Sequence, residues 1–282
     1  MKLSLDTAEI YVPDGTPVTE ALARTTHMGV GAHPDDLEVF AWDGIVQCFH
    51  RADRWFTGIV VTDGGGSPRD GVYKQYTDEE MRAVRREEQK KAAGIGEYSA
   101  VALLDYPSKA VKDASDARVV DDIRRLLEAA QPKVVYTHNP ADKHDTHVAV
   151  MLRTIEAIRS LKPATRPQRV LGCEVWRDLD WLVDADKVAL DCSAHEDLQR
   201  ALVSVFDSQI AGGKRYDLAT MGRRCAHATY HESHGTDVAT GLIFAMDLTP
   251  LVEDDARDVT AFVQDYLDRF AQDVAARLKK LR

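Results

Sequence analysis

A chain of 282 residues can bury a large core as a single domain, and its formal net charge of −10 argues against a role in binding nucleic acid. No apolar run approaches the roughly 18 residues of a membrane span, and residues 1–6 lack the apolar stretch of a signal peptide. We therefore expect a cytoplasmic protein that binds neither nucleic acid nor membranes. Its four well-separated cysteines favour buried, reduced thiols over a structural zinc site.

Apolar runs typical of strands alternate along the chain with longer amphipathic stretches typical of helices. After a first strand that leads into His33, strands are expected at 55–61, 100–104, 134–137 and 170–176. Helical patterns occupy about 39–51, 78–94, 114–130 and 146–161, and a C-terminal helix is expected at about 255–281. This alternation predicts an α/β fold in one domain of residues 1–282, with a Rossmann-like, mostly parallel sheet covered by helices on both faces.

The first strand runs into a histidine and three carboxylates in residues 33–38 (HPDDLE). His33 and Asp36 are three residues apart across a turn stiffened by Pro34, so both can reach one ion, and zinc accepts imidazole and carboxylate ligands. Asp35 then points elsewhere and is free to take a proton from a metal-bound water. Glu38 falls in the first turn of the following helix, where a negative charge suits the helix dipole. The alternative is a helix N-cap with an incidental histidine.

This hexapeptide resembles the signature of the LmbE/PIG-L family, metal-dependent deacetylases that act on N-acetylated amino sugars and related glycoconjugates. The family carries a His-x-x-His pair after a later strand, and residues 136–147 (YTHNPADKHDTH) resemble that segment. The resemblance implies that His147 is the third metal ligand and that His144 is the oxyanion stabiliser or general acid. Since a positive charge stabilises an oxyanion best, we expect His144 to be protonated. Thr146 departs from the acidic residue or asparagine common before the ligand. The alternative is a polar loop with incidental histidines.

Weaker similarities follow in the family's order and extend the resemblance over roughly residues 28–245. They lie at residues 60–64, 85–96, 104–107, 206–209 and 230–232. A nucleotide site is the less favoured alternative, because Gly29-Val30-Gly31 is followed by His33-Pro34 and lacks the third glycine of the dinucleotide fingerprint.

Three side chains outside these motifs are candidate substrate contacts: Arg69, Trp42 and His231. Arg69 lies in a glycine-rich segment, residues 63–76, that has the length of a lid or binding loop. Trp42 and Trp176 could stack on a sugar, although packing in the core is the alternative for each. His231 shares helical spacing with His227 and His234, a pattern that also suits a solvated or core-edge face or a second metal site.

The function implied by this pattern is a metal-dependent hydrolase that removes an N-acetyl group from an amino sugar or glycoconjugate. The expected cofactor is Zn²⁺, with Fe²⁺ or another divalent ion as alternatives. The alternative functions are an amidase acting on a larger thiol or antibiotic conjugate and a catalytically silent sugar-binding protein. An apolar stripe at residues 259–274 packs on the domain itself or joins subunits of a homo-oligomer.

Overall fold

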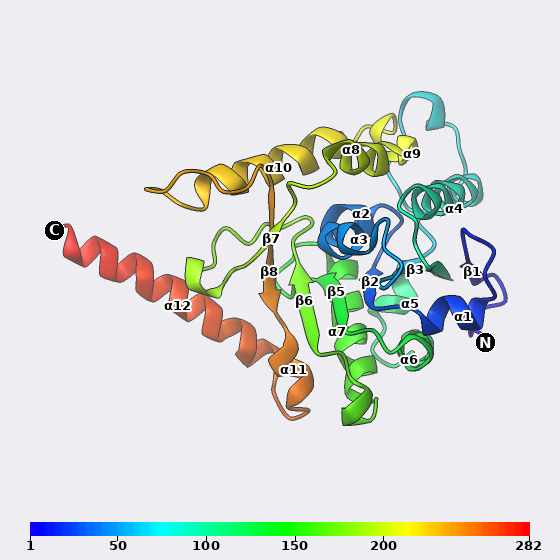
Figure 1. Cartoon of the computed structure of the whole chain (residues 1–282), viewed down its shortest axis with the longest axis horizontal. Helices are drawn as coiled ribbons and strands as arrows, with labels where there is room; N and C mark the ends of the chain where they lie inside the picture. Colours follow the sequence, from blue (N-terminus) through cyan, green and yellow to red (C-terminus); the bar gives the residue numbers. More distant parts are fainter.

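A single mixed β-sheet runs through the molecule, and the computed structural model describes residues 1–282 around it (Figure 1). Its eight strands are β1 Glu9–Tyr11, β2 His27–Gly31, β3 Phe56–Thr62, β4 Ala100–Tyr106, β5 Val134–His138, β6 Arg169–Cys173, β7 Val188–Asp191 and β8 Leu242–Asp247. The strands lie in the order β1-β4-β3-β2-β5-β6-β8-β7. The central five, from β4 to β6, are parallel, whereas β1, β7 and β8 pair antiparallel with their neighbours.

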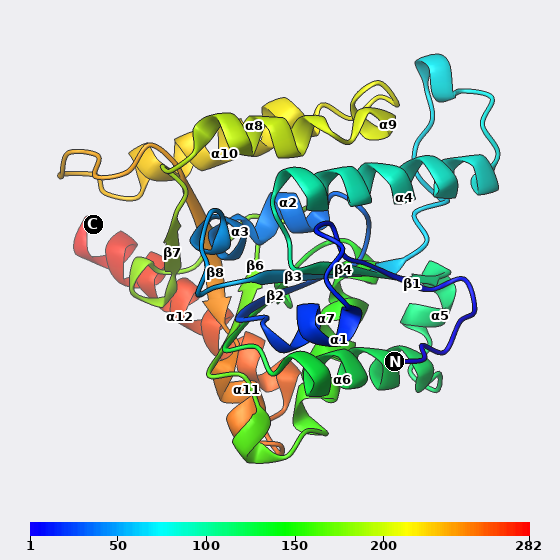
Figure 2. The ribbon, with the colours of Figure 1, turned by 45° about the vertical axis from the view of Figure 1, so that its right-hand side comes forward.

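Helices cover both faces of this sheet, which confirms the predicted architecture (Figure 2). They are α1 Val18–Ala23, α2 Asp36–Phe40, α3 Trp42–Cys48, α4 Asp78–Ile95, α5 Ser108–Lys112, α6 Arg118–Ala130, α7 Asp145–Arg159, α8 Glu196–Ser204, α9 Asp207–Ile210, α10 Tyr216–Tyr230, α11 Thr249–Glu253 and α12 Val259–Lys280. Short 3-10 turns occur at Gly71–Tyr73, Pro163–Thr165 and Asp184–Asp186. None of the helices is both long and apolar enough to cross a membrane.

Two hydrophobic clusters hold the layers together, one on each side of the sheet. The larger has 37 buried residues and joins the sheet to α1, α5, α6, α7, α11 and the start of α12. The smaller has 23 buried residues and joins it to α2, α3, α4 and α8. All seven residues of β3 are buried, because a parallel strand in the middle of the sheet is covered on both faces. This explains why the strand reads as a continuous apolar run rather than as an alternating pattern.

Several predicted helices begin or end differently in the structure. The helix expected at 39–51 is broken at Ala41 into α2 and α3, and the one expected at 114–130 starts at Arg118. A capping box formed by Thr77 and Glu80 starts α4, which agrees with the helix expected from residue 78. The C-terminal helix α12 buries Phe262 near its start, but Phe270 is 39% exposed because the rest of the helix projects beyond the sheet (Figure 1). The apolar stripe therefore packs on the domain only at its beginning.

Two glycines in helices differ sharply in the space around them, and this difference predicts opposite effects on stability. A Cβ at Gly44 in α3 would lie 2.6 Å from the Tyr136 ring, whereas a Cβ at Gly222 in α10 would meet nothing within 4 Å. Gly44→Ala should lower the free energy of unfolding by about 1–3 kcal/mol through overpacking. Gly222→Ala should raise it by about 0.4–1 kcal/mol, because alanine restricts the unfolded chain. Urea unfolding of both variants tests this, and equal midpoints would contradict it.

Candidate metal centre

The two histidine-bearing segments lie together because their strands are neighbours in the sheet. β2 and β5 pair in parallel, so their carboxyl ends open at the same edge. The segment after β2 carries His33 and turns into α2 at Asp36. The segment after β5 leads to His144, the N-cap of α7, and to His147 in the first turn of that helix. The sheet thus brings together residues that are more than a hundred positions apart in the chain.

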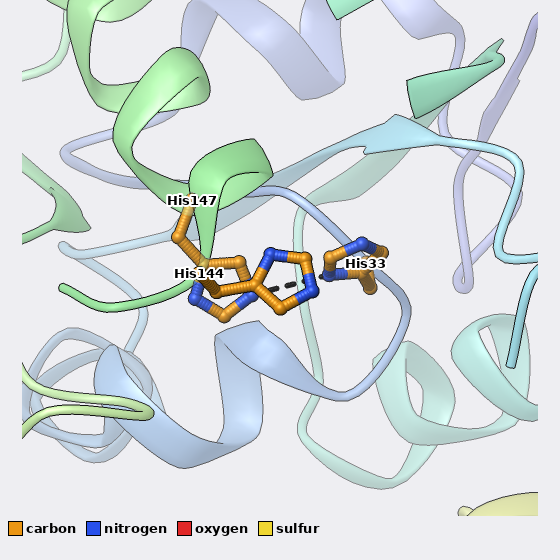
Figure 3. Close-up of side chains that lie close together, drawn as sticks. All are labelled: His33, His144 and His147. Carbon is orange, nitrogen blue, oxygen red and sulfur yellow. Dashed lines mark hydrogen bonds between the residues drawn. The ribbon is translucent and has the colours of Figure 1, made fainter. Parts of the chain in front are cut away.

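Three side chains predicted as metal ligands point their donor atoms at one another. Nδ1 of His33 lies 3.2 Å from Nε2 of His147 and 3.4 Å from Oδ2 of Asp36. Nε2 of His147 lies 3.6 Å from Oδ1 of Asp36. Ligands of a tetrahedral ion with bonds of 2.0–2.1 Å are about 3.4 Å apart, so this spacing suits a divalent metal. In Figure 3 the His33 ring lies on one side of the cluster, and the rings of His144 and His147 lie together on the other.

Asp142 orients one of these donors from behind. Its Oδ2 lies 3.5 Å from Nδ1 of His147, the ring nitrogen that faces away from the other donors, and it also accepts the backbone N–H of Trp176. Its Oδ1 accepts the backbone N–H of His144 at 2.9 Å. A carboxylate at Nδ1 fixes the tautomer that leaves Nε2 free to bind a metal. Asp145, the nearer carboxylate in sequence, is exposed and plays no such part.

A further histidine, His138 at the end of β5, packs against the centre without completing it. Its Nε2 accepts the backbone N–H of Ala32 at 2.9 Å, which uses the lone pair that a metal would need. Its ring stacks on that of His147 with the two centroids 4.0 Å apart. Although Nε2 of His138 is also 3.5 Å from Asp36, the structure favours a packing role for this ring.

Asp35 faces the same space from a left-handed backbone conformation, with φ of 99°. Two residues one turn apart on α4 hold it there. Nη2 of Arg85 donates to Oδ2 of Asp35 at 3.0 Å and to the carbonyl of Pro34, and Gln89 accepts the backbone N–H of Asp35 while donating to Glu38. Burial raises the pKa of the Asp35 carboxyl to about 8, although the Arg85 guanidinium opposes this shift. Such a group can accept and return a proton near neutral pH.

The ring of His144 lies against both histidine donors and against the cavity wall. Its centroid is 4.5 Å from that of His147, 5.1 Å from that of His33 and 6.2 Å from that of Trp176. Ring nitrogens of His33, His144 and His147 fall within 4.8 Å of one another, so the geometry alone also allows His144 as a ligand. Burial, with His147 and His33 close by, lowers the pKa of His144 to about 4. This environment favours a neutral imidazole, not the protonated one expected from the sequence.

A cavity of about 640 Å³ opens beside these residues and is lined by His33, Asp35, Asp36 and His144. Its other walls come from the 63–68 loop, α4, α5, the end of β6 and α10. Trp176 and Arg85 are part of this lining. Sequence reasoning treated Trp176 mainly as a core residue and Arg85 only as a weak family similarity. The cavity is large enough for more than a single small sugar, since drug-sized ligands occupy roughly 300–1,000 Å³.

The three predicted substrate contacts lie outside this lining. Trp42 is 0% exposed and belongs to the hydrophobic cluster under α3, so it cannot meet a substrate. Arg69 turns its guanidinium to Asp78 and to the carbonyl of Gly65. His231 follows the end of α10, with its ring 5.5 Å from that of Phe244. Beyond the motif residues, the cavity wall is formed by other side chains, among them Trp176 and Tyr216.

The three histidines with helical spacing, His227, His231 and His234, do not lie together in the structure. His227 is buried in α10, where its Nε2 lies 2.8 Å from Oε1 of Glu174 and its ring stacks on Phe244. His234 lies beyond the end of α10 and is exposed. The three rings therefore form no second metal cluster, and His227 packs as a buried partner of Glu174.

Comparison with known proteins agrees with this fold. Residues 28–158 match the family model described as PIG-L, GlcNAc-PI de-N-acetylase. A protein of Escherichia coli (strain K12) named uncharacterized deacetylase YaiS is 25% identical over 166 residues, 58% of this chain and 80% of that protein. Residues 28–158 therefore carry a PIG-L (LmbE-like) deacetylase family domain.

Two solved structures show how widely the fold is used. The N,N'-diacetylchitobiose deacetylase from Pyrococcus horikoshii has a TM-score of 0.60 at 16% identity, covering 78% of this chain and 83% of that one. GalB, the 4-carboxy-2-hydroxymuconate hydratase from Pseudomonas putida KT2440, has a TM-score of 0.57 at 17% identity, covering 79% of this chain and 96% of that one. Because a hydratase and a deacetylase share this fold, the activity of this chain has to be argued from its site.

The geometry predicts how metal affinity depends on His147 and on the carboxylate behind it. His147→Ala should abolish stoichiometric binding of a divalent ion, since it removes one of three donors. Asp142→Asn should weaken binding by about 10–100-fold, the usual effect of losing a group that orients a ligand. The exposed Asp145→Asn is the matched control and should bind as the unchanged protein does. Zinc titration against a chelating indicator measures all three, and an unaltered affinity in His147→Ala would contradict the assignment.

Proposed function

We propose that this chain is a metal-dependent hydrolase that removes an N-acetyl group from an amino sugar or glycoconjugate. The observation that carries the proposal is the convergence of His33, Asp36 and His147 at the edge of a cavity that Asp35 also faces. The match of residues 28–158 to a family of de-N-acetylases supports it, as does the likeness to a diacetylchitobiose deacetylase.

In this proposal His33, Asp36 and His147 would hold a divalent ion, with zinc favoured by the mixed nitrogen and oxygen donors and iron(II) compatible with them. When bound, such an ion supplies a Lewis acid for the acetamide carbonyl and makes water a stronger nucleophile. The nearly equal spacing of the three donors supports this assignment. Asp142 then keeps the His147 ring in the tautomer that the site requires.

Asp35 is the proposed proton carrier. As a water molecule attacks the carbonyl carbon, Asp35 accepts its proton, and when the carbon–nitrogen bond breaks Asp35 delivers that proton to the departing nitrogen. The products are acetate and a free amine. The Arg85 bond holds one oxygen of Asp35, which leaves the other oxygen to make these transfers. The raised pKa of the Asp35 carboxyl suits a group that works in both directions.

His144 is the proposed donor to the oxyanion that develops on the carbonyl oxygen. It lines the cavity next to the donor atoms, and its backbone is fixed by the N-cap position of α7 and by the bond to Asp142. A neutral imidazole can donate one N–H bond to that oxygen without carrying charge into the site.

The size of the cavity favours a glycoconjugate over a single sugar, and it also supports the second candidate, an amidase acting on a larger thiol or antibiotic conjugate. A silent sugar-binding protein would have no need of Asp35 and the arginine that holds it. Release of acetate from a panel of N-acetylated sugars, glycosides and glycopeptides, measured with the zinc-loaded protein, tests the proposal. Complete failure to release acetate while a longer acyl amide is cleaved would favour the amidase.

Asp35→Asn should retain the metal and lose most of the turnover. The amide of asparagine keeps the shape of the side chain but cannot accept a proton from water at neutral pH. We expect kcat to fall by about 10²–10⁴-fold, the usual contribution of a general base. The measurement is acetate release together with metal content, and near-normal turnover with metal bound would assign the base to another group.

His144→Ala should leave the metal content and the fold intact while lowering kcat by about 100-fold or more, the typical loss for one oxyanion donor. Its KM should change little, because the bond forms chiefly in the transition state. Steady-state kinetics and metal analysis of the same preparation separate the two roles open to this residue. Loss of the metal would make His144 a ligand and contradict the oxyanion role.

A further inference from the structure

Five cationic side chains line the cavity of a protein whose net charge is −10. Two of them have partners inside the fold. Arg85 is paired with Asp35, and the buried Arg224 donates to the carbonyls of Glu38 and Val39 and to the side chain of Gln199. The other three form no ion pair with any carboxylate of the chain: Lys112, Lys214 and Arg223.

Lys214 and Arg223 contact two consecutive residues, Trp176 and Val175. Nζ of Lys214 lies 5.2 Å from the centre of the Trp176 ring, and Nη1 of Arg223 donates to the carbonyl of Val175. Lys112 is on α5, across the sheet from α10 (Figure 2). Lys214 and Arg223 therefore lie on the same wall of the cavity, the one that carries Val175 and Trp176, and Lys112 stands apart from it.

This wall is next to the reacting centre. Trp176 is held by the bond from its backbone N–H to Asp142, and its ring lies 6.2 Å from that of His144 at an angle of 25°. Tyr216 meets the Trp176 ring edge-on, with the centroids 6.1 Å apart and the planes at 89°. The wall thus presents an indole beside His144, with Lys214 over the indole and Arg223 bonded to the preceding residue, Val175.

We propose that Lys214 and Arg223 form a subsite for an anionic group, a phosphate or a carboxylate, carried by the substrate beyond its acetamido sugar. The inference rests on the proposed function and names the class of substrate: an acidic glycoside or glycoconjugate. Trp176 supplies the surface on which the sugar ring stacks between the metal centre and this subsite. A neutral substrate would gain nothing from two cations that no protein carboxylate neutralises.

The chemistry of the two side chains fits such a group. Arg223 uses one guanidinium nitrogen on the carbonyl of Val175, so its remaining N–H donors can bind two oxygens of a phosphate or carboxylate. The ammonium of Lys214 has three donors and no hydrogen-bond partner in the fold. Partial enclosure in a cavity strengthens such charge-assisted bonds relative to the open surface.

The test compares three ligands that the enzyme cannot hydrolyse, because each lacks the acetyl group: methyl glucosaminide, carboxymethyl glucosaminide and glucosamine 1-phosphate. Calorimetric titration of the zinc-loaded protein should give a Kd about tenfold lower for at least one acidic ligand than for the neutral one, as expected for one charge-assisted bond. The ratio of the Kd for the neutral ligand to the Kd for the acidic ligand should fall when the salt concentration is raised, because salt screens the charges.

Variants test whether Lys214 and Arg223 are the source of this preference for acidic ligands. In the double variant Lys214→Met, Arg223→Met the ratio of neutral to acidic Kd should fall to within about twofold of one, since the charges that select the anion are gone. Lys162→Met, at an exposed lysine without an ion pair, is the matched control and should keep the ratio. If the double variant does not fold, Lys214→Gln alone should lower the ratio about threefold.

Two results would overturn the subsite. One is equal affinity of the unchanged protein for the neutral and both acidic ligands. The other is an anion preference that persists in the variants, which would assign the anion to the metal centre. Because these ligands are not substrates, neither result depends on turnover. Failure of the protein to release acetate from any N-acetylated compound would count against the proposed function and leave the binding result standing.

Discussion

The Asp36 carboxylate is the group on which the rest of the centre depends. Its Oδ2 accepts the backbone N–H of His33 at 2.7 Å, and its two oxygens lie 3.4–3.6 Å from three imidazoles. Burial opposes ionisation, but His147, His138 and His33 together hold the pKa of Asp36 well below its usual range. A permanent negative charge at this point gathers nitrogen donors and would offset the charge of a bound metal ion, while the adjacent Asp35 has a raised pKa and could carry a proton.

This arrangement is possible because a short helix lies very close to its own strand. α2 packs on β2, and a Cβ at Gly29 would come within 2.8 Å of Leu37 and 2.9 Å of Phe56. Glycine at position 29 therefore leaves room for Leu37 over β2, and Gly31, where a Cβ would lie 3.1 Å from that of Asp36, leaves room for Asp36 at the end of the strand. Asp35, in its left-handed conformation, contacts Arg85, whereas the adjacent Asp36 contacts His33 and His147.

Sequence patterns could predict the elements formed by neighbouring residues. They could predict fewer of the contacts between residues that are far apart in the chain. The central strands, the helices α4 and α7 and the edge of the sheet at which the motifs meet were predictable, because each follows from a run of neighbouring residues. Arg85 bonds Asp35 across fifty positions, and Asp142 reaches both His147 and Trp176, so no spacing rule marks them. Trp42 and Trp176 look equivalent as aromatic residues, yet one is core and the other lines the cavity. The edge strands β1 and β7 were missed because they are short and only partly buried.

Net charge, similarly, describes the surface of this protein better than its site. Exposed charges are screened over about 8 Å at physiological salt, so the excess of carboxylates on the surface has little influence inside a cavity. What a ligand meets there is set by the few side chains whose charges the fold leaves unpaired. The carboxylates Asp35 and Asp36 are engaged by Arg85 and by the histidines, whereas Lys214 and Arg223 have no such partner. An acidic protein can thus present a locally cationic wall, and the charge of its substrate is better inferred from the wall than from the composition.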